Sequence, residues 1–142
     1  MSSEDNKALV HRLFEDLIQQ GNPALADEFF APEFVHHFPD EDIHGPDGVK
    51  QLVGGLRATF PDWHISTDDV IAEEDKVVIR FTIDATHQGE GFNIHPMGKR
   101  VVYTGIDIFR IANGKFVEQW TEVDALGLLR QLGVIPAPGQ AS

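Results

Sequence analysis

The sequence predicts an α+β fold in which a curved antiparallel sheet wraps around N-terminal helices and forms an open cone. Apolar residues recur at helical spacing as far as Phe60, whereas from Trp63 onward they alternate with polar residues as in β-strands. Helices followed by a run of long strands and a closing helix are typical of α+β proteins. The 142 residues suit one domain, which we expect over residues 1–135, with 136–142 as a flexible C-terminal tail.

Three helices are expected before the strands. The first has apolar positions from Leu9 to Ile18 at helical spacing and ends at Gly21. Asn22 and Pro23 are typical of a helix start and open a short second helix. The third follows Pro46, with Val49, Leu52, Val53, Leu56 and Phe60 on one face.

Four strands are expected next, over residues 63–72, 76–88, 99–112 and 115–123, with a last helix over 125–132. Asn113 and Gly114 tolerate positive φ, so they indicate a hairpin between the last two strands. We interpret its loop as the three residues 112–114, which pairs Asp107 with Gln119 and Gly105 with Thr121. A two-residue loop would instead bring Asp107 beside Trp120.

Composition limits the possible partners and compartment. The chain has 23 acidic and 11 basic residues and a net charge of −12, which disfavours nucleic acids and anionic membranes as partners. It contains no cysteine, which excludes disulfides, thiolate metal sites and cysteine nucleophiles. The polar N-terminal segment does not resemble a signal peptide. We therefore expect a cytoplasmic protein.

Several motifs carry a resemblance to a known family. They are Gly45-Pro46-Asp47-Gly48-Val49, Phe60-Pro61-Asp62, Thr86-His87, the segment 104–111 with Asn113-Gly114-Lys115, and the segments 118–124 and 128–133. Together they resemble the SnoaL-like polyketide cyclases over nearly the whole chain. The resemblance implies an NTF2-like cone (a cystatin-like roll), usually dimeric or tetrameric. It also implies closure of polyketide rings by aldol condensation, without cofactor or metal.

One position departs from the family pattern. In the aldol cyclases a catalytic aspartate directly follows the tryptophan found here as Trp120, but this chain has Thr121. A hydroxyl cannot serve as a general base near neutral pH. The partner position, a histidine in the cyclases, is Asp107. In an apolar cone its pKa would be raised, which suits a general base.

The expected site has two catalytic residues, Asp107 and His37. Adjacent strand residues point to opposite faces, so one of His36 and His37 should enter the pocket mouth, and we assign His37. The expected substrate-binding residues are Gln119, Thr121, Tyr103, Phe109 and Phe81. No metal site is expected, because the histidines lie in loops and on opposite strand faces. The loop 89–98 resembles the family's pocket-covering segment.

Each of these assignments has a structural alternative. Asp107 could be a polar residue at a sheet edge, and Gln119 and Thr121 could pair across strands for stability alone.

Three functions remain open from the sequence. The first is cofactor-free acid–base chemistry on a hydrophobic carbonyl compound, by aldol cyclisation, isomerisation or dehydration. The second is non-catalytic binding of a small hydrophobic ligand, and the third is an interaction module. A homodimer is expected, because the outer sheet face would carry Trp120 and Ile108.

Overall fold

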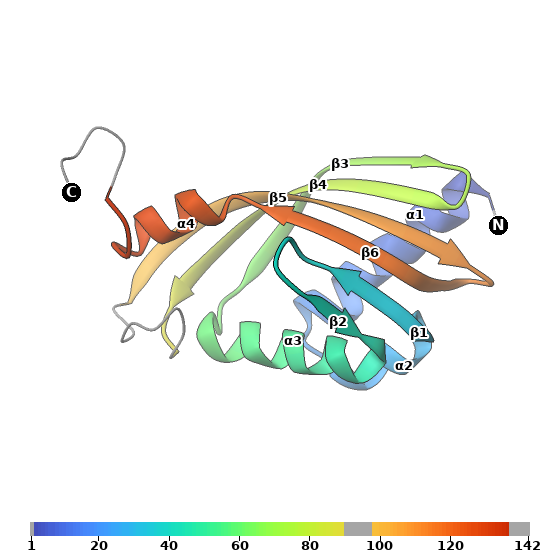
Figure 1. The fold of residues 1–142 in the computed structure, drawn as a ribbon, viewed down its shortest axis with the longest axis horizontal. Coiled ribbons are helices and arrows are strands. Elements are labelled where there is room, and N and C mark those ends of the chain that lie inside the picture. Colours follow the sequence, from blue (N-terminus) through green and yellow to red (C-terminus); the bar gives the residue numbers. More distant parts are fainter. Residues whose placement is uncertain (1, 90–97, 137–142) are drawn as a thin grey trace.

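A computed structural model of the chain describes residues 2–89 and 98–136. Its centre is a curved, unclosed sheet of six strands in the order β2-β1-β6-β5-β4-β3 (Figure 1). The strands are β1 (Phe30–His37), β2 (Asp42–His44), β3 (His64–Glu73), β4 (Lys76–His87), β5 (Lys99–Ala112) and β6 (Lys115–Val123). The predicted α+β class is therefore confirmed.

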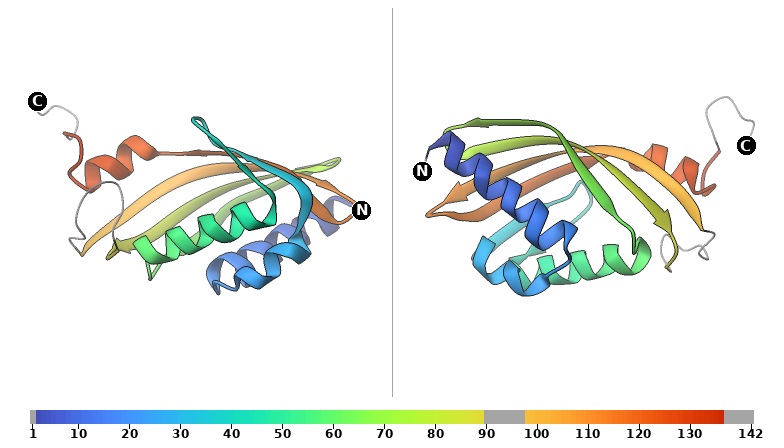
Figure 2. Two further views of the ribbon diagram at one scale, coloured as in Figure 1. Left: turned by 60° about the horizontal axis from the view of Figure 1, so that its bottom comes forward. Right: turned by 180° about the vertical axis from the view of Figure 1, so that it is seen from behind.

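The helices lie on the concave side of the sheet, as the two further views show (Figure 2). They are α1 (Ser3–Arg12) with its π-helical continuation η1 (Leu13–Gln19), the 3-10 turn η2 (Pro23–Leu25), α2 (Ala26–Phe29), α3 (Gly45–Thr59) and α4 (Ala125–Gln131). Helices α1 and α3 lie beneath the arch of long strands, whereas α4 follows β6 at one end of the arch. The core fills the space between helices and sheet.

Local chemistry explains where the helices begin. Ser2 and Asp5 form a reciprocal capping box at the start of α1. Pro46 stands in the first turn of α3, after Gly45 with a φ of 70°. The Asp124 side chain accepts a hydrogen bond of 2.9 Å from the Gly127 N–H at the start of α4.

The four long strands follow the prediction closely, but the sheet holds two strands more. Strand β1, which includes Pro32, was not predicted. It runs parallel to β6, with His36 beside Gln119, whereas the four predicted strands pair antiparallel as expected. The short strand β2 then pairs with β1 at the sheet edge. Residues 90–97 of the predicted covering loop and 137–142 of the predicted tail lie outside the described residues.

The hairpin between β5 and β6 corrects the predicted register. Its loop has two residues, Asn113 and Gly114, with φ of 53° and 75°, and Ala112 pairs with Lys115. Such turns fit the right-handed twist of paired strands. A bulge follows, between the pairs Ile111–Phe116 and Arg110–Glu118. It adds one residue to β6 and restores the side-chain alternation.

As a result, Asp107 lies opposite Thr121 rather than Gln119. The three-residue loop was therefore wrong. The shared inward face of Asp107, Gln119 and Thr121 is confirmed, since all three side chains are buried on the concave side.

Candidate active site

A cavity of about 270 Å³ lies between the helices and the concave face of the sheet. Its lining is mostly apolar and comes from η1, α3 and α4 together with the inward side chains of β1 and β3 to β6. Its polar lining residues are His36, Tyr103, Asp107, Gln119 and Thr121. A mostly apolar cavity with a few convergent polar groups is typical of a small-molecule site.

A larger and more open hollow, of about 540 Å³, lies elsewhere. It is lined by Asn6, Glu74, Asp75, Ile111, Asn113 and Gly114. None of these is a predicted site residue, so the smaller cavity is the candidate site.

The centre of the cavity is a chain of hydrogen bonds joining three side chains from three strands. The Thr121 hydroxyl on β6 donates a short hydrogen bond to Asp107 Oδ1 on β5. His36 Nε2, on β1, lies 2.6 Å from Thr121 Oγ1. Because the hydroxyl proton points to Asp107, the hydroxyl oxygen accepts, and His36 donates through its Nε2–H. All three side chains are buried.

Burial shifts the pKa values of the two titratable residues in this hydrogen-bond network, Asp107 and His36, in opposite directions. Desolvation raises the pKa of Asp107 to about 6, although hydrogen bonds from Thr121 and Gln119 act against it. Desolvation, with a smaller effect of the neighbouring His37, lowers the pKa of His36 to about 4. At neutral pH His36 is therefore a neutral donor, and Asp107 is an ionised carboxylate more basic than an exposed aspartate.

The apolar part of the cavity contains the predicted aromatic residues. Phe81, Tyr103 and Phe109 all line it, from β4 and β5. Burial also raises the pKa of the Tyr103 hydroxyl, so this group stays protonated at neutral pH. The structure therefore brings Asp107 together with all five predicted substrate-binding residues in one cavity.

His37, by contrast, does not line the cavity, and its expected place at the pocket mouth is wrong. Neighbouring residues of a strand point to opposite faces, and on β1 it is His36 that faces inward. The alternation of Phe34, His36 and Phe38 was the signal that could have identified His36. Both Phe34 and His36 are buried, and the rings of His36 and Phe38 lie 4.1 Å apart.

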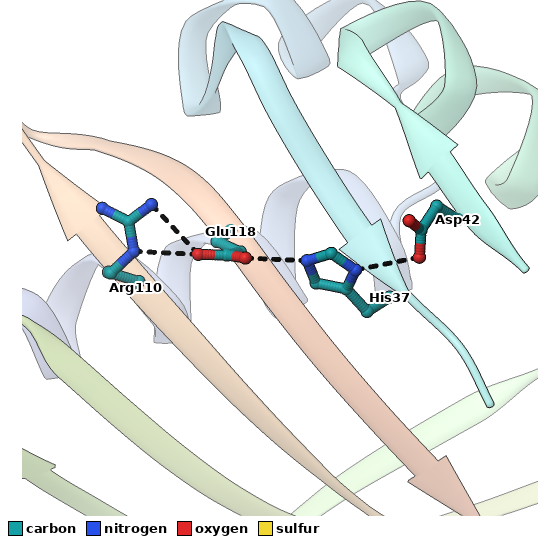
Figure 3. A network of polar contacts seen from close by, with 4 residues as sticks. All are labelled: His37, Asp42, Arg110 and Glu118. Atoms are coloured by element: carbon teal, nitrogen blue, oxygen red, sulfur yellow. Dashed lines mark hydrogen bonds and ion pairs between the residues drawn. The ribbon is translucent and has the colours of Figure 1, made fainter.

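On the outer face, His37 belongs to a polar network that spans four strands (Figure 3). Its Nε2 lies 2.7 Å from Glu118 Oε2 on β6, and its Nδ1 lies 2.8 Å from Asp42 Oδ1 on β2. Glu118 Oε1 in turn accepts from Arg110 Nη2 on β5 at 3.0 Å. The His37 ring also stacks on Trp120, with centroids 5.5 Å apart. We call these residues, His37, Asp42, Glu118 and Arg110, the outer network.

Within residues 2–89 and 98–136, no three histidine or acidic side chains form a group that could hold a metal ion. In the same ranges, no helix has the length and hydrophobicity that crossing a membrane requires.

Comparison with known proteins places the chain in a family. The sequence profile of the SnoaL-like polyketide cyclases matches residues 8–132. Nogalonic acid methyl ester cyclase of Streptomyces nogalater is 30% identical over 111 residues, which cover 75% of this chain and 82% of the relative.

Solved structures give the same answer for the fold. AclR of Streptomyces galilaeus, a proposed hydroxylase, superposes with a TM-score of 0.85 at 33% identity, covering 98% of this chain and 87% of AclR. TsrD of Streptomyces laurentii superposes with a TM-score of 0.84 at 30% identity, covering 95% and 99% of the two chains. The protein therefore belongs to the SnoaL-like polyketide cyclase family and has its NTF2-like fold.

Proposed function

We propose that the protein catalyses cofactor-free acid–base chemistry on a hydrophobic carbonyl compound, with Asp107 as general base. The observation that carries the proposal is the Asp107 carboxylate, which is 5% exposed within an apolar cavity. Burial raises its pKa to about 6. A carboxylate with a pKa near the working pH combines basicity with the ionised form, as general-base catalysis requires.

In the first step Asp107 removes a proton from the carbon next to the substrate carbonyl. The electrons of the broken C–H bond form an enolate, whose oxygen needs hydrogen-bond donors. The Gln119 amide and the Tyr103 hydroxyl are the cavity donors available for this role. The single Nε2–H of neutral His36 is donated to Thr121, so this histidine orients the Thr121 hydroxyl toward Asp107 instead.

The later steps distinguish three related reactions. In an aldol cyclisation the enolate carbon attacks a second carbonyl, and the resulting alkoxide recovers a proton from Asp107. In an isomerisation the proton returns to a different carbon. In a dehydration the β-hydroxyl leaves with the proton from Asp107, as water. The methyl ester cyclase from S. nogalater favours the first of these, with a polyketide ester as substrate.

The missing aspartate after Trp120 fits this proposal. Thr121 at that position is the direct cross-strand partner of Asp107 and donates a hydrogen bond to it. The carboxylate thus comes from β5 rather than β6. It lies in the cavity within hydrogen-bond distance of position 121, where the usual aspartate would stand.

A second candidate is non-catalytic binding of a hydrophobic ligand in the same cavity. The presence of Thr121 at the usual aspartate position favours it, as does the mostly apolar lining. The two candidates differ in whether a bound carbonyl compound loses a proton.

One experiment separates them. Exchange of the α-protons of a neutral aromatic β-keto methyl ester in D₂O is followed by NMR with wild type and Asp107→Asn. General-base catalysis predicts exchange by the wild type and a rate roughly 10²–10⁴-fold lower in the variant. Equal rates in both proteins would remove Asp107 from the mechanism. Binding without exchange in either protein would leave only the binding function.

We also infer that the protein forms a homodimer through the outer face of its sheet. Ile71, Val78, Ile108 and Trp120 pair in one row across that face, and Ile71 and Ile106 are 62% and 47% accessible. Contiguous exposed apolar area is typical of a protein interface. Light scattering at micromolar concentration should give about twice the chain mass of 15.8 kDa, and a strictly monomeric mass would contradict the inference.

A further inference from the structure

Gly105 lies directly behind the cavity lining, two residues before Asp107 on the same face of β5. Its neighbours across the sheet are Phe81 on β4 and Val123 on β6. Both side chains line the cavity. Gly105 is therefore placed among residues that would contact a bound molecule close to the proposed base.

The space above Gly105 is filled by its neighbours. A Cβ added at this position would lie 2.8 Å from Phe81 Cε2, closer still to Phe81 Cζ, and 2.9 Å from Val123 Cγ1. Real Cβ atoms essentially never come this close to another heavy atom. In contrast to Gly114, which has a φ of 75°, Gly105 has no left-handed backbone conformation. The structure requires glycine here because of space alone.

We infer that Gly105 is a specificity-determining residue, because it lets the Phe81 ring lie against the sheet and keeps the cavity beside Asp107 open for a broad, flat substrate. Any larger residue at this position displaces Phe81 or Val123 toward the cavity. The inference rests on this cavity being the substrate site, as in the proposed function. It does not require Asp107 to act as a base.

The alternative is that Gly105 serves only the packing of the sheet, since aromatic residues often cover glycines in strongly curved sheets. The two readings predict different results. A structural role predicts lower stability and weaker binding of every ligand to a similar extent. A role in specificity predicts that large ligands are lost while small ones are retained.

The test measures the affinity of three neutral probes of increasing width for wild type and Gly105→Ala. The probes are 1,4-naphthoquinone, 9,10-anthraquinone and tetracene-5,12-quinone. We expect the variant to lose roughly 10-fold or more in affinity for the widest probe, the usual effect of one methyl group in a tight apolar pocket. The narrowest probe should bind nearly as before.

Two further variants keep the test informative if Gly105→Ala folds poorly. Phe81→Trp narrows the same region without changing the backbone and should give the same preference for narrow probes. Phe81→Leu combined with Gly105→Ala relieves the overlap and should restore binding of the widest probe. Gly54→Ala is the matched control, because its Cβ on α3 meets nothing within 4 Å.

Equal losses for all three probes, unchanged binding of the widest probe, or no binding of any probe to the wild type would overturn the inference. Its failure is distinguishable from that of the proposed function, because these affinities are measured without turnover. If Gly105→Ala selects by size while Asp107→Asn leaves proton exchange unchanged, the specificity role stands and the base assignment falls. The opposite pair of results removes only the role of Gly105.

Discussion

The adjacent histidines His36 and His37 lie on opposite faces of the sheet, and their pKa values shift in opposite directions. His36 points into the apolar cavity, where burial lowers its pKa to about 4. His37, the next residue on β1, points outward, and hydrogen bonds to Glu118 and Asp42 raise its pKa. The same side chain is thus a neutral donor at neutral pH on the inner face, whereas on the outer face its charged form is favoured.

The acidic side chains of the two faces also differ in their surroundings. On the inner face Asp107 has a hydroxyl and an amide as partners, and its pKa is raised by burial. On the outer face Glu118 contacts both Arg110 and His37. Solvent and opposite charges stabilise ionised groups outside, whereas inside only neutral donors oppose the cost of desolvation. Inner substitutions should therefore have larger effects than outer ones.

The largest expected effect on stability comes from Asp107→Asn. The pKa of Asp107 in the folded protein is raised from 3.8 to about 6, so ionisation destabilises the fold as pH rises through that range. The variant lacks this penalty, so its free energy of unfolding at pH 8 should exceed that of the wild type by up to about 3 kcal/mol. At pH 3.5 the gain should disappear. Urea unfolding at both pH values measures it, and a loss of stability at pH 8 would mean that the carboxylate is not penalised by burial.

The next effect concerns the pH dependence of proton abstraction. Thr121→Val removes a hydrogen bond that lowers the pKa of Asp107, so the rise of activity with pH should move to higher pH. Thr82→Val is the matched control, because Thr82 donates to Asp68 at 2.7 Å on the outer face. It should leave the profile unchanged. The pH profile of α-proton exchange measures both, and an identical profile in Thr121→Val would show that the hydroxyl does not tune the base.

A smaller effect is expected when the outer network is broken by Glu118→Gln. Because the pKa of His37 is raised in the folded state, its interactions stabilise the fold fully below about pH 6.5, and this contribution is lost as pH rises through the folded pKa. The variant should be less stable by about 1 kcal/mol or less at pH 6. The contribution of His37 to this difference should vanish near pH 9.

Asp69→Asn is the control for this prediction. It breaks the exposed pair with Arg80, whose Nε lies 2.8 Å from Asp69 Oδ2, but involves no histidine. Its effect on unfolding should therefore be the same at pH 6 and pH 9. If Glu118→Gln behaves like this control at both pH values, His37 is not a cation in the folded protein.

The sequence predicted the inner face well wherever alternation within one strand decides the outcome. Tyr103, Asp107 and Phe109 lie on one face of β5 because even numbers of residues separate them. This shared face does not depend on the partner strand. The register between β5 and β6 was less accessible, because a two-residue turn and a bulge offset each other and local patterns reveal only the turn.

The inner histidine was missed for a related reason. Two adjacent histidines give no preference between faces unless the segment is known to be a strand and its buried side is known. The segment 30–37 forms a strand only by pairing with β6, which lies more than 80 residues later in the chain. The alternation of Phe34, His36 and Phe38 indicates the buried side only once the segment is known to be a strand, and the contacts with β6 that make it one are not visible in local periodicity.

The smallest expected effect tests whether the two faces influence each other. The charge on His37 contributes to lowering the pKa of His36, after the larger effect of burial. Replacing the outer histidine by His37→Gln should therefore raise the pKa of His36 slightly, while desolvation keeps it below the usual value of 6.5. Imidazole ¹⁵N chemical shifts of His36, recorded from pH 3 to 8, measure this value directly. His11→Gln is the control, since that histidine lies on α1 and should leave the titration unchanged. A His36 pKa that returns fully to 6.5 in His37→Gln would mean that charge, not burial, keeps the inner histidine neutral. An unchanged pKa would show that the two faces are electrostatically independent, although their histidines are neighbours in the chain.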